Sequence, residues 1–135
     1  MARSFAVYRA EDREFIERPP KDVYSQEFES WEAECWRRRL CEGPLGSEGV
    51  IRVYWSEPAQ RLRLPLIASI YDDGFYRGCD WSGPDLDRLA TELYVLTAYW
   101  RQEGLEDLPW LEERADGLRK GIDIAREARG FLFIT

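Results

Sequence analysis

The chain has 135 residues, a formal net charge of −7 and no histidine, and its basic residues are two lysines against 17 arginines. A hydrophobic content of 44% at this length predicts one folded domain over residues 1–135. The acidic balance argues against nucleic acid and anionic membrane surfaces as partners, and no apolar run approaches the ~20 residues of a membrane span.

The first third of the chain predicts a strand and a long helix. Ser4–Arg9 is short and rich in strand-forming residues. After Pro19-Pro20, a helix is predicted from about residue 22 to 40. Its apolar stripe has the spacing i, i+4, i+7, i+11 and consists of Tyr24, Phe28, Trp31 and Cys35. Acids in the early turns and Arg37-Arg38-Arg39 in the last turn complement the helix dipole.

The middle third predicts a three-strand meander. Residues 50–55 and 61–71 alternate apolar and polar side chains, which is typical of strands. Asp72-Asp73-Gly74 suits a tight hairpin turn, and residues 75–81 return as the third strand. Pro65 has no N–H to donate, which favours a sheet edge or a bulge at that point.

The last third predicts two helices and a final strand. Ser82-Gly83-Pro84-Asp85 starts a helix, with Ser82 as its cap, that runs to Glu103 and ends at Gly104. A second helix opens near Asp107. Its predicted buried stripe is Leu111, Ala115, Leu118, Ile122 and Ala125, and Gly117 and Gly121 within it indicate close approach of another element. Residues 131–134 form the last strand.

The predicted order is therefore β-α-β-β-β-α-α-β. We expect an α+β fold of two layers, in which a mostly antiparallel sheet packs with about three helices. The central meander supplies three strands of that sheet, and the two terminal strands can extend it.

The sequence offers few candidates for catalytic or metal-binding residues. Without histidine the chain has no Ser-His or Cys-His nucleophile system and no HExxH zinc site. Cys35, Cys41 and Cys79 are a poor zinc set and too few for a disulfide scaffold, which favours reduced thiols and a cytoplasmic location. Cys41 follows three arginines, which would lower its pKa if they lay close. We expect no catalytic residues, no metal and no cofactor.

Two groups of residues are candidates for binding. The first surrounds the predicted hairpin and comprises Tyr71, Asp72, Asp73, Tyr76 and Asp80. Turn chemistry alone explains the aspartates, and their spacing matches no calcium loop. The second lies in residues 11–34, which hold nine acids and three bases. Such a run is either a solvated face or an acidic surface that steers and docks a basic partner. Its candidate residues are Glu27, Glu29, Glu32 and Glu34, with Trp36 as a possible exposed anchor.

These features favour a small protein that binds a partner protein, a basic one, and does not catalyse a reaction. In size and charge the chain looks like bacterial toxin-neutralising immunity proteins, which use acidic surfaces against basic enzymes. This is a likeness of kind, since no motif is shared. One alternative is an acidic secretion chaperone, whose partner is an unfolded segment. Another is a small-ligand or enzyme domain with a pocket lined by Arg52, Arg63, Tyr76 and Asp80. The oligomeric state stays open.

Overall fold

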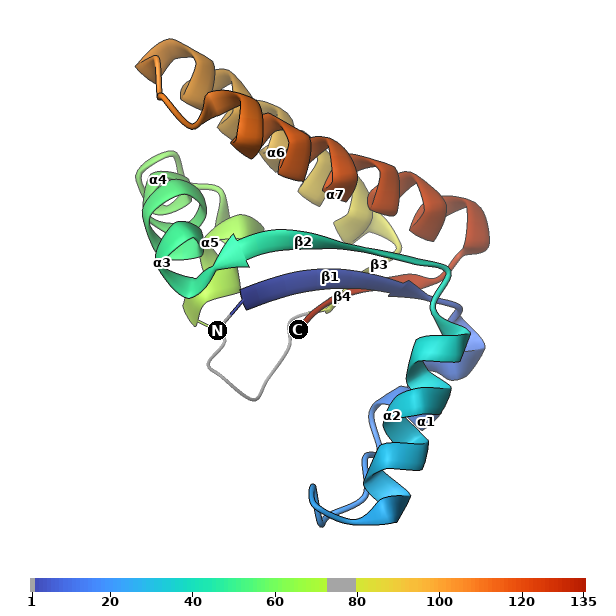
Figure 1. The fold of residues 1–135 in the computed structure, drawn as a ribbon. Helices are drawn as coiled ribbons and strands as arrows, with labels where there is room; N and C mark the ends of the chain where they lie inside the picture. Colours follow the sequence, from blue (N-terminus) through green and yellow to red (C-terminus); the bar gives the residue numbers. More distant parts are fainter. Residues whose placement is uncertain (1, 73–79) are drawn as a thin grey trace.

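The computed structural model describes residues 2–72 and 80–135. Its sheet contains β1 (Ala2–Tyr8), β2 (Cys41–Ser47), β3 (Asp80–Ser82) and β4 (Phe131–Ile134) in the order β2-β1-β4-β3. Every neighbouring pair is antiparallel. The two terminal strands lie side by side at the centre of the sheet (Figure 1), so the α+β class and the antiparallel sheet are confirmed.

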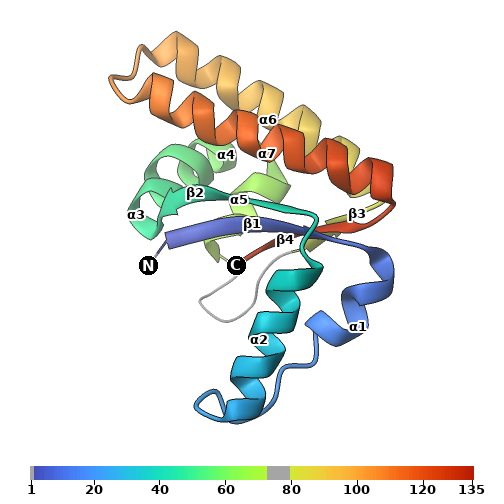
Figure 2. The ribbon, with the colours of Figure 1, turned by 45° about the vertical axis from the view of Figure 1, so that its right-hand side comes forward.

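One face of the sheet is covered by two long antiparallel helices, α6 (Pro84–Glu103) and α7 (Leu108–Ala128). Figures 1 and 2 show them as a layer above the strands. The predicted α7 stripe, from Leu111 to Ala125, is fully buried, and α6 ends at Gly104 in the left-handed conformation. The helix periodicity thus predicted both elements. Ser82 is not the cap of α6, because Gly83 holds that position and no side chain bonds there.

Phe5 of β1 explains why α7 carries a mid-helix glycine. A Cβ on Gly121 would lie 2.5 Å from Cε2 of Phe5, closer than real carbon atoms approach. A Cβ on Gly43 of β2 would lie 2.6 Å from Cε1 of the same ring. The ring therefore packs between two glycines, and the predicted close approach at Gly121 is confirmed. At Gly117 the corresponding distance is 3.9 Å, an ordinary contact.

The predicted meander is wrong for its first two strands, because residues 48–61 and 65–72 are helical. They form α3 (Glu48–Val50), a π-helical segment η2 (Ile51–Ser56), α4 (Glu57–Arg61) and α5 (Pro65–Asp72). Ile51, Trp55 and Ala59 are fully buried and stand one turn apart, so a helical period was hidden within the alternating pattern. Pro65 is not at a sheet edge but begins α5, where no N–H is needed.

The rest of the meander is only partly described. The first strand of the predicted hairpin is not formed, because its residues belong to helices, and Asp72 ends α5. Of the predicted third strand, residues 80 and 81 belong to β3, and the remainder lies outside the described residues together with Asp73 and Gly74.

The segment that follows the first helix contains Gly43, Pro44 and Gly46 and forms the edge strand β2. It pairs along β1 from Ala2↔Ser47 to Val7↔Cys41, with a bulge between Arg3 and Ser4. Pro44 is tolerated here because an edge strand has one side without ladder bonds. Leu45 of this strand is fully buried.

The other face of the sheet carries a second, smaller core. Ala6 and Tyr8 of β1 and Phe131 of β4 meet Ile16 and Cys35 there. Ile16 ends the short helix α1 (Arg13–Ile16), which follows a single 3-10 turn, η1 (Ala10–Asp12), and Cys35 lies in α2 (Gln26–Arg38). These two helices project from one end of the sheet, on the side away from α6 and α7 (Figure 1).

Candidate functional site

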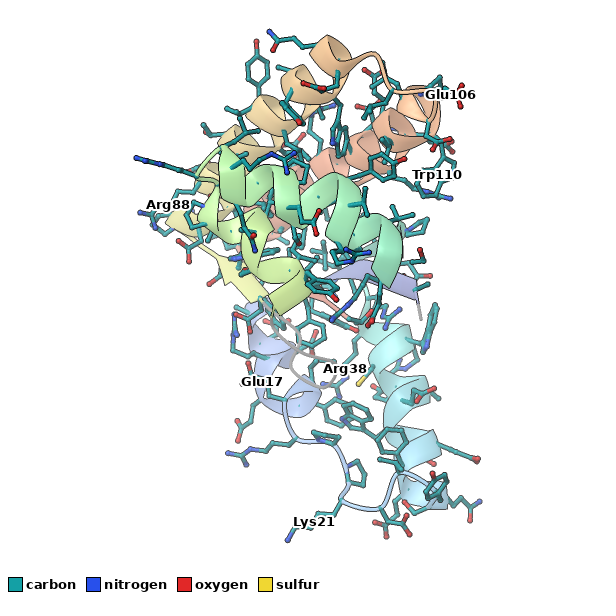
Figure 3. The ribbon with its side chains drawn as sticks, turned by 90° about the vertical axis from the view of Figure 1, so that its left-hand side faces the viewer. Glu17, Lys21, Arg38, Arg88, Glu106 and Trp110 are labelled. Atoms are coloured by element: carbon teal, nitrogen blue, oxygen red, sulfur yellow. The ribbon has the colours of Figure 1, made fainter. Side chains whose placement is uncertain are left out.

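Residues 13–38 form a projecting unit, here called the arm, that consists of α1, the connection that follows it, and α2. In Figures 1 and 2 the arm extends away from the sheet, and its far end is the connection between the two helices. Glu17 and Lys21, labelled in Figure 3, lie along this descending connection. The arm therefore presents more of its surface to solvent than a helix packed flat on the sheet.

The arm is fixed internally and at its base. Trp31 donates its indole N–H to the Phe15 carbonyl at 2.9 Å, which ties α2 to α1. Arg38 bonds to Asp12 at 3.0 Å, and its guanidinium lies 4.0 Å from the centre of the Phe15 ring. At the base, Arg13 pairs with Asp80 of β3 at 2.6 Å. These contacts hold the arm in one orientation on the body.

The four predicted acids of α2 do not behave alike. Glu27, Glu29 and Glu32 are exposed, and their side chains bond to no other residue in the described part of the chain. Glu34 instead accepts hydrogen bonds from Arg37 and Arg38 at 2.6–2.9 Å. Those two guanidinium groups lower the pKa of Glu34 to about 2. Only the first three acids offer uncompensated charge.

Aromatic side chains accompany those acids. Trp36 is 53% exposed, and Arg39 lies 4.1 Å from its ring centre. Helical spacing puts Trp36 on the same flank of α2 as Glu32 and Glu29, which are four and seven residues away. Before α2, Tyr24 is 94% exposed, so its predicted place in the buried stripe is wrong. The reason is that α2 begins only at Gln26, with Ser25 as its cap.

A groove of about 630 Å³ runs between the two sides of the arm. The residues that line it are Phe15, Arg18, Pro20, Gln26, Glu27, Ser30 and Trp31. It joins an apolar floor to the Glu27 carboxylate at its rim. The sequence pattern did not reveal this groove, because α1 and α2 are separated by a connection without periodicity.

The second predicted group is not assembled as a site. Tyr71 is partly exposed at the end of α5, where its backbone N–H bonds to the Ser56 hydroxyl at 3.2 Å. Asp80 is engaged by Arg13 and so serves the join between arm and body. Asp72 ends α5, and Asp73 and Tyr76 lie outside the described residues.

The predicted pocket residues are likewise separate where the structure describes them. Arg52 pairs with Glu57 at 3.3 Å, whereas Asp80 pairs with Arg13. Arg63 borders a cavity near the start of α5 with Leu66 and Glu92. Tyr76 lies outside the described residues.

The two thiols that the structure describes, Cys35 and Cys41, have raised pKa values. Burial raises the pKa of Cys35 to about 11, and burial also raises that of Cys41. Burial and the neighbouring Glu42 raise the pKa of Cys41, and none of the three preceding arginines is among the causes, so the condition for a lowered pKa is not met. Within residues 2–72 and 80–135, no three Cys, Asp or Glu side chains gather in a way that could hold a metal ion.

Comparison with known proteins adds no relative: no protein-family model, no curated protein and no solved structure matches the chain. Across the described ranges, no helix has both the length and the apolar character needed to cross a membrane.

Proposed function

We propose that the protein binds a basic partner protein through the arm, as an immunity-type or inhibitor-type protein in the cytoplasm that neutralises a basic toxin or enzyme. The observation that carries the proposal is the arm itself. It projects from the body and combines three unpaired carboxylates with exposed aromatic side chains.

The two kinds of side chain have different roles in this proposal. Glu27, Glu29 and Glu32 attract a basic surface over about a Debye length, ~8 Å at physiological salt, and so raise the association rate. Trp36 and Tyr24 supply the apolar contact that slows dissociation, because large aromatic side chains dominate binding hot spots. Glu34 is left out of the binding set, because its charge is already paired with Arg37 and Arg38.

The rigidity of the arm supports this role. A docking element that is ordered before binding loses less conformational entropy when the complex forms. The Trp31–Phe15 hydrogen bond and the Arg13–Asp80 ion pair supply that order here. The partner thus meets a preformed surface.

The test compares two triple variants that change net charge equally. One is E27K/E29K/E32K on the arm, and the control is E103K/E106K/E113K at exposed positions of α6, α7 and the turn between them. Tagged forms are used to capture partners from the native lysate at low and high salt. The association rate of each identified partner is then measured against salt concentration.

We expect the wild type and the control to retain the same basic protein, and the arm variant to lose it. The arm variant should also show a smaller fall of association rate with salt. A partner bound equally by both variants, with equal salt dependence, would refute the role of the acids. A partner captured only when unfolded would instead favour a secretion chaperone.

A further inference from the structure

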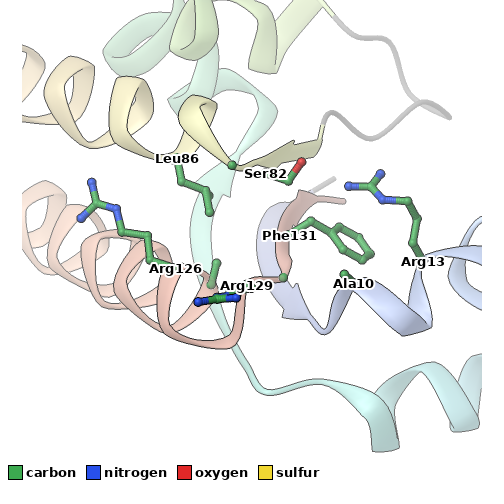
Figure 4. Close-up of a pocket in the computed structure, with 10 residues that line it drawn as sticks. Ala10, Arg13, Ser82, Leu86, Arg126, Arg129 and Phe131 are labelled. Atoms are coloured by element: carbon green, nitrogen blue, oxygen red, sulfur yellow. The ribbon is translucent and has the colours of Figure 1, made fainter.

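A cavity of about 420 Å³ lies at the end of the sheet where the arm joins the body. It is bounded by the start of α6, the end of α7 and the first residue of β4 (Figure 4). This volume falls in the range of small-molecule sites, ~300–1,000 Å³. It is separate from the groove of the arm, with which it shares no lining residue.

The charge of this cavity is opposite to that of the protein. Three arginines line it, Arg13, Arg126 and Arg129, and no acid is among its lining residues. Figure 4 shows Arg13 and Arg126 on opposite sides of the cavity, with Arg129 between them. Arg13 pairs with Glu17 and Asp80, and Arg126 pairs with Asp87 and Asp123, so the uncompensated positive charge at the cavity comes from Arg129.

Arg129 is the arginine best placed to receive a ligand. Arg13 is paired with Asp80, and Arg126 is paired with Asp87 at 2.7 Å. The Arg129 side chain is exposed and bonds to no other residue that the structure describes. It keeps its full capacity of five N–H donors for an incoming anion.

The backbone at Arg129 also departs from the usual choice. This residue ends α7 with φ of 52°, in the left-handed region where glycine is the ordinary occupant. A side chain kept at such a position carries a conformational cost that helix termination does not require.

The remainder of the wall is apolar or neutral. Leu86, Ala125 and Phe131 lie at its base and are at most 2% exposed, whereas Ala10 is an exposed apolar residue of the lining. The Ser82 hydroxyl lies on the rim (Figure 4). The site thus combines cations at its edge with an apolar base. A ligand that fits it has an anionic group and a compact apolar part.

We propose that this cavity binds a small phosphomonoester. Arginine donors bind phosphate oxygens in a planar, two-point geometry that suits a dianion. Arg129 makes that contact, and Ser82 adds a hydroxyl donor. The apolar part of the ligand lies against Ala10, the exposed apolar residue of the lining.

The test uses titration calorimetry at low ionic strength with three probes: inorganic phosphate, phenyl phosphate and benzoate. We expect saturable binding of both phosphates, with phenyl phosphate tighter because its ring also contacts Ala10. Amide shifts in NMR spectra should map the bound phosphate to residues 82–86 and 125–131. Benzoate binding as tight as phenyl phosphate would overturn the assignment to a phosphomonoester, as would phenyl phosphate binding no tighter than inorganic phosphate.

The decisive variant is Arg129→Gly, because glycine suits the backbone at this position. It should fold with an unchanged or higher melting temperature and bind phenyl phosphate about 10- to 100-fold more weakly. Arg119→Gln, on an exposed face of α7 away from the cavity, should bind as the wild type does. Equal binding by the wild type and R129G, or no saturable binding by the wild type, would overturn the proposal.

Discussion

Glu92 of α6 is a buried carboxylate that stabilises the start of α5. It is 7% exposed, and its Oε1 accepts hydrogen bonds from the N–H groups of Leu66 and Ile67, both at 3.0 Å. Pro65 has no N–H, and the Ala68 N–H bonds to the Leu64 carbonyl. Glu92 therefore satisfies the first-turn donors of α5 that have no partner within the helix.

Replacing Glu92 by alanine leaves those two N–H groups without a partner. The Ile67 group is fully buried, and an unsatisfied buried donor costs about 1–3 kcal/mol. Leu66 is half-buried, so water can compensate part of its loss. We expect E92A to lower the free energy of unfolding by about 2–4 kcal/mol. E92Q keeps one carbonyl oxygen where Oε1 lies and should cost less than about 1 kcal/mol.

The pH dependence separates charge from hydrogen bonding. Burial raises the pKa of Glu92 above its ordinary value of about 4.5, despite the Ile67 and Leu66 amides and the nearby Arg88. The folded state then holds this proton more tightly than the unfolded state, so the contribution of Glu92 to stability falls as pH rises above about 4.5. E92Q lacks this titration, so its stability relative to wild type should increase between pH 4 and pH 7.

Urea unfolding followed by circular dichroism at several pH values measures both effects. Glu103→Ala is the matched control, because Glu103 is an exposed acid on the same helix, and it should change stability by less than about 0.5 kcal/mol. The reasoning is refuted if E92A is as stable as E103A. It also fails if the difference between E92Q and wild type is constant with pH or changes in the opposite direction.

Two further predictions concern packing and thiol reactivity. Gly121→Ala should lower the free energy of unfolding by about 1–3 kcal/mol in urea unfolding, because the new Cβ meets the Phe5 ring. Gly117→Ala should raise it by up to about 1 kcal/mol, because alanine has the higher helix propensity. Equal effects of the two variants would contradict the packing of the Phe5 ring against Gly121. At pH 8, iodoacetamide should alkylate Cys35 and Cys41 far more slowly than free cysteine, since the thiolate is the reacting form and burial raises both pKa values. Peptide mass spectrometry over time measures this, urea should restore the rate, and rapid native labelling of Cys35 would show that it is not buried.

The candidate site was found in part from the sequence. The acidic run and its Trp36 predicted a charged surface, and exposure of Glu27, Glu29, Glu32 and Trp36 is observed. Glu34, another candidate, is instead paired with Arg37 and Arg38, three and four residues further along the same helix. The projection of the arm could not be predicted, because it depends on where the chain leaves β1 and enters β2.

The sequence by itself determined α6, α7 and β4. In α6 and α7 the apolar period predicts the buried face, and Gly104 ends α6 as expected, so local preference and burial favour the same structure. It also determined the antiparallel α+β class and the buried positions of Cys35 and the α7 stripe.

Only the tertiary structure decided the segment 48–72 and the strand β2. Ile51, Val53 and Trp55 fit a strand, and Ile51, Trp55 and Ala59 fit a helix equally well. Contacts decide between them, since Trp55 packs edge-on against Trp100 at 5.1 Å and Trp100 donates to the Tyr54 carbonyl. In β2, pairing with β1 overrides the turn preference of Gly43 and Pro44, and the Phe5 ring requires the glycine. The physical reason is the same in both places: local preferences are worth about 1 kcal/mol per residue or less, and burial against distant residues is worth more.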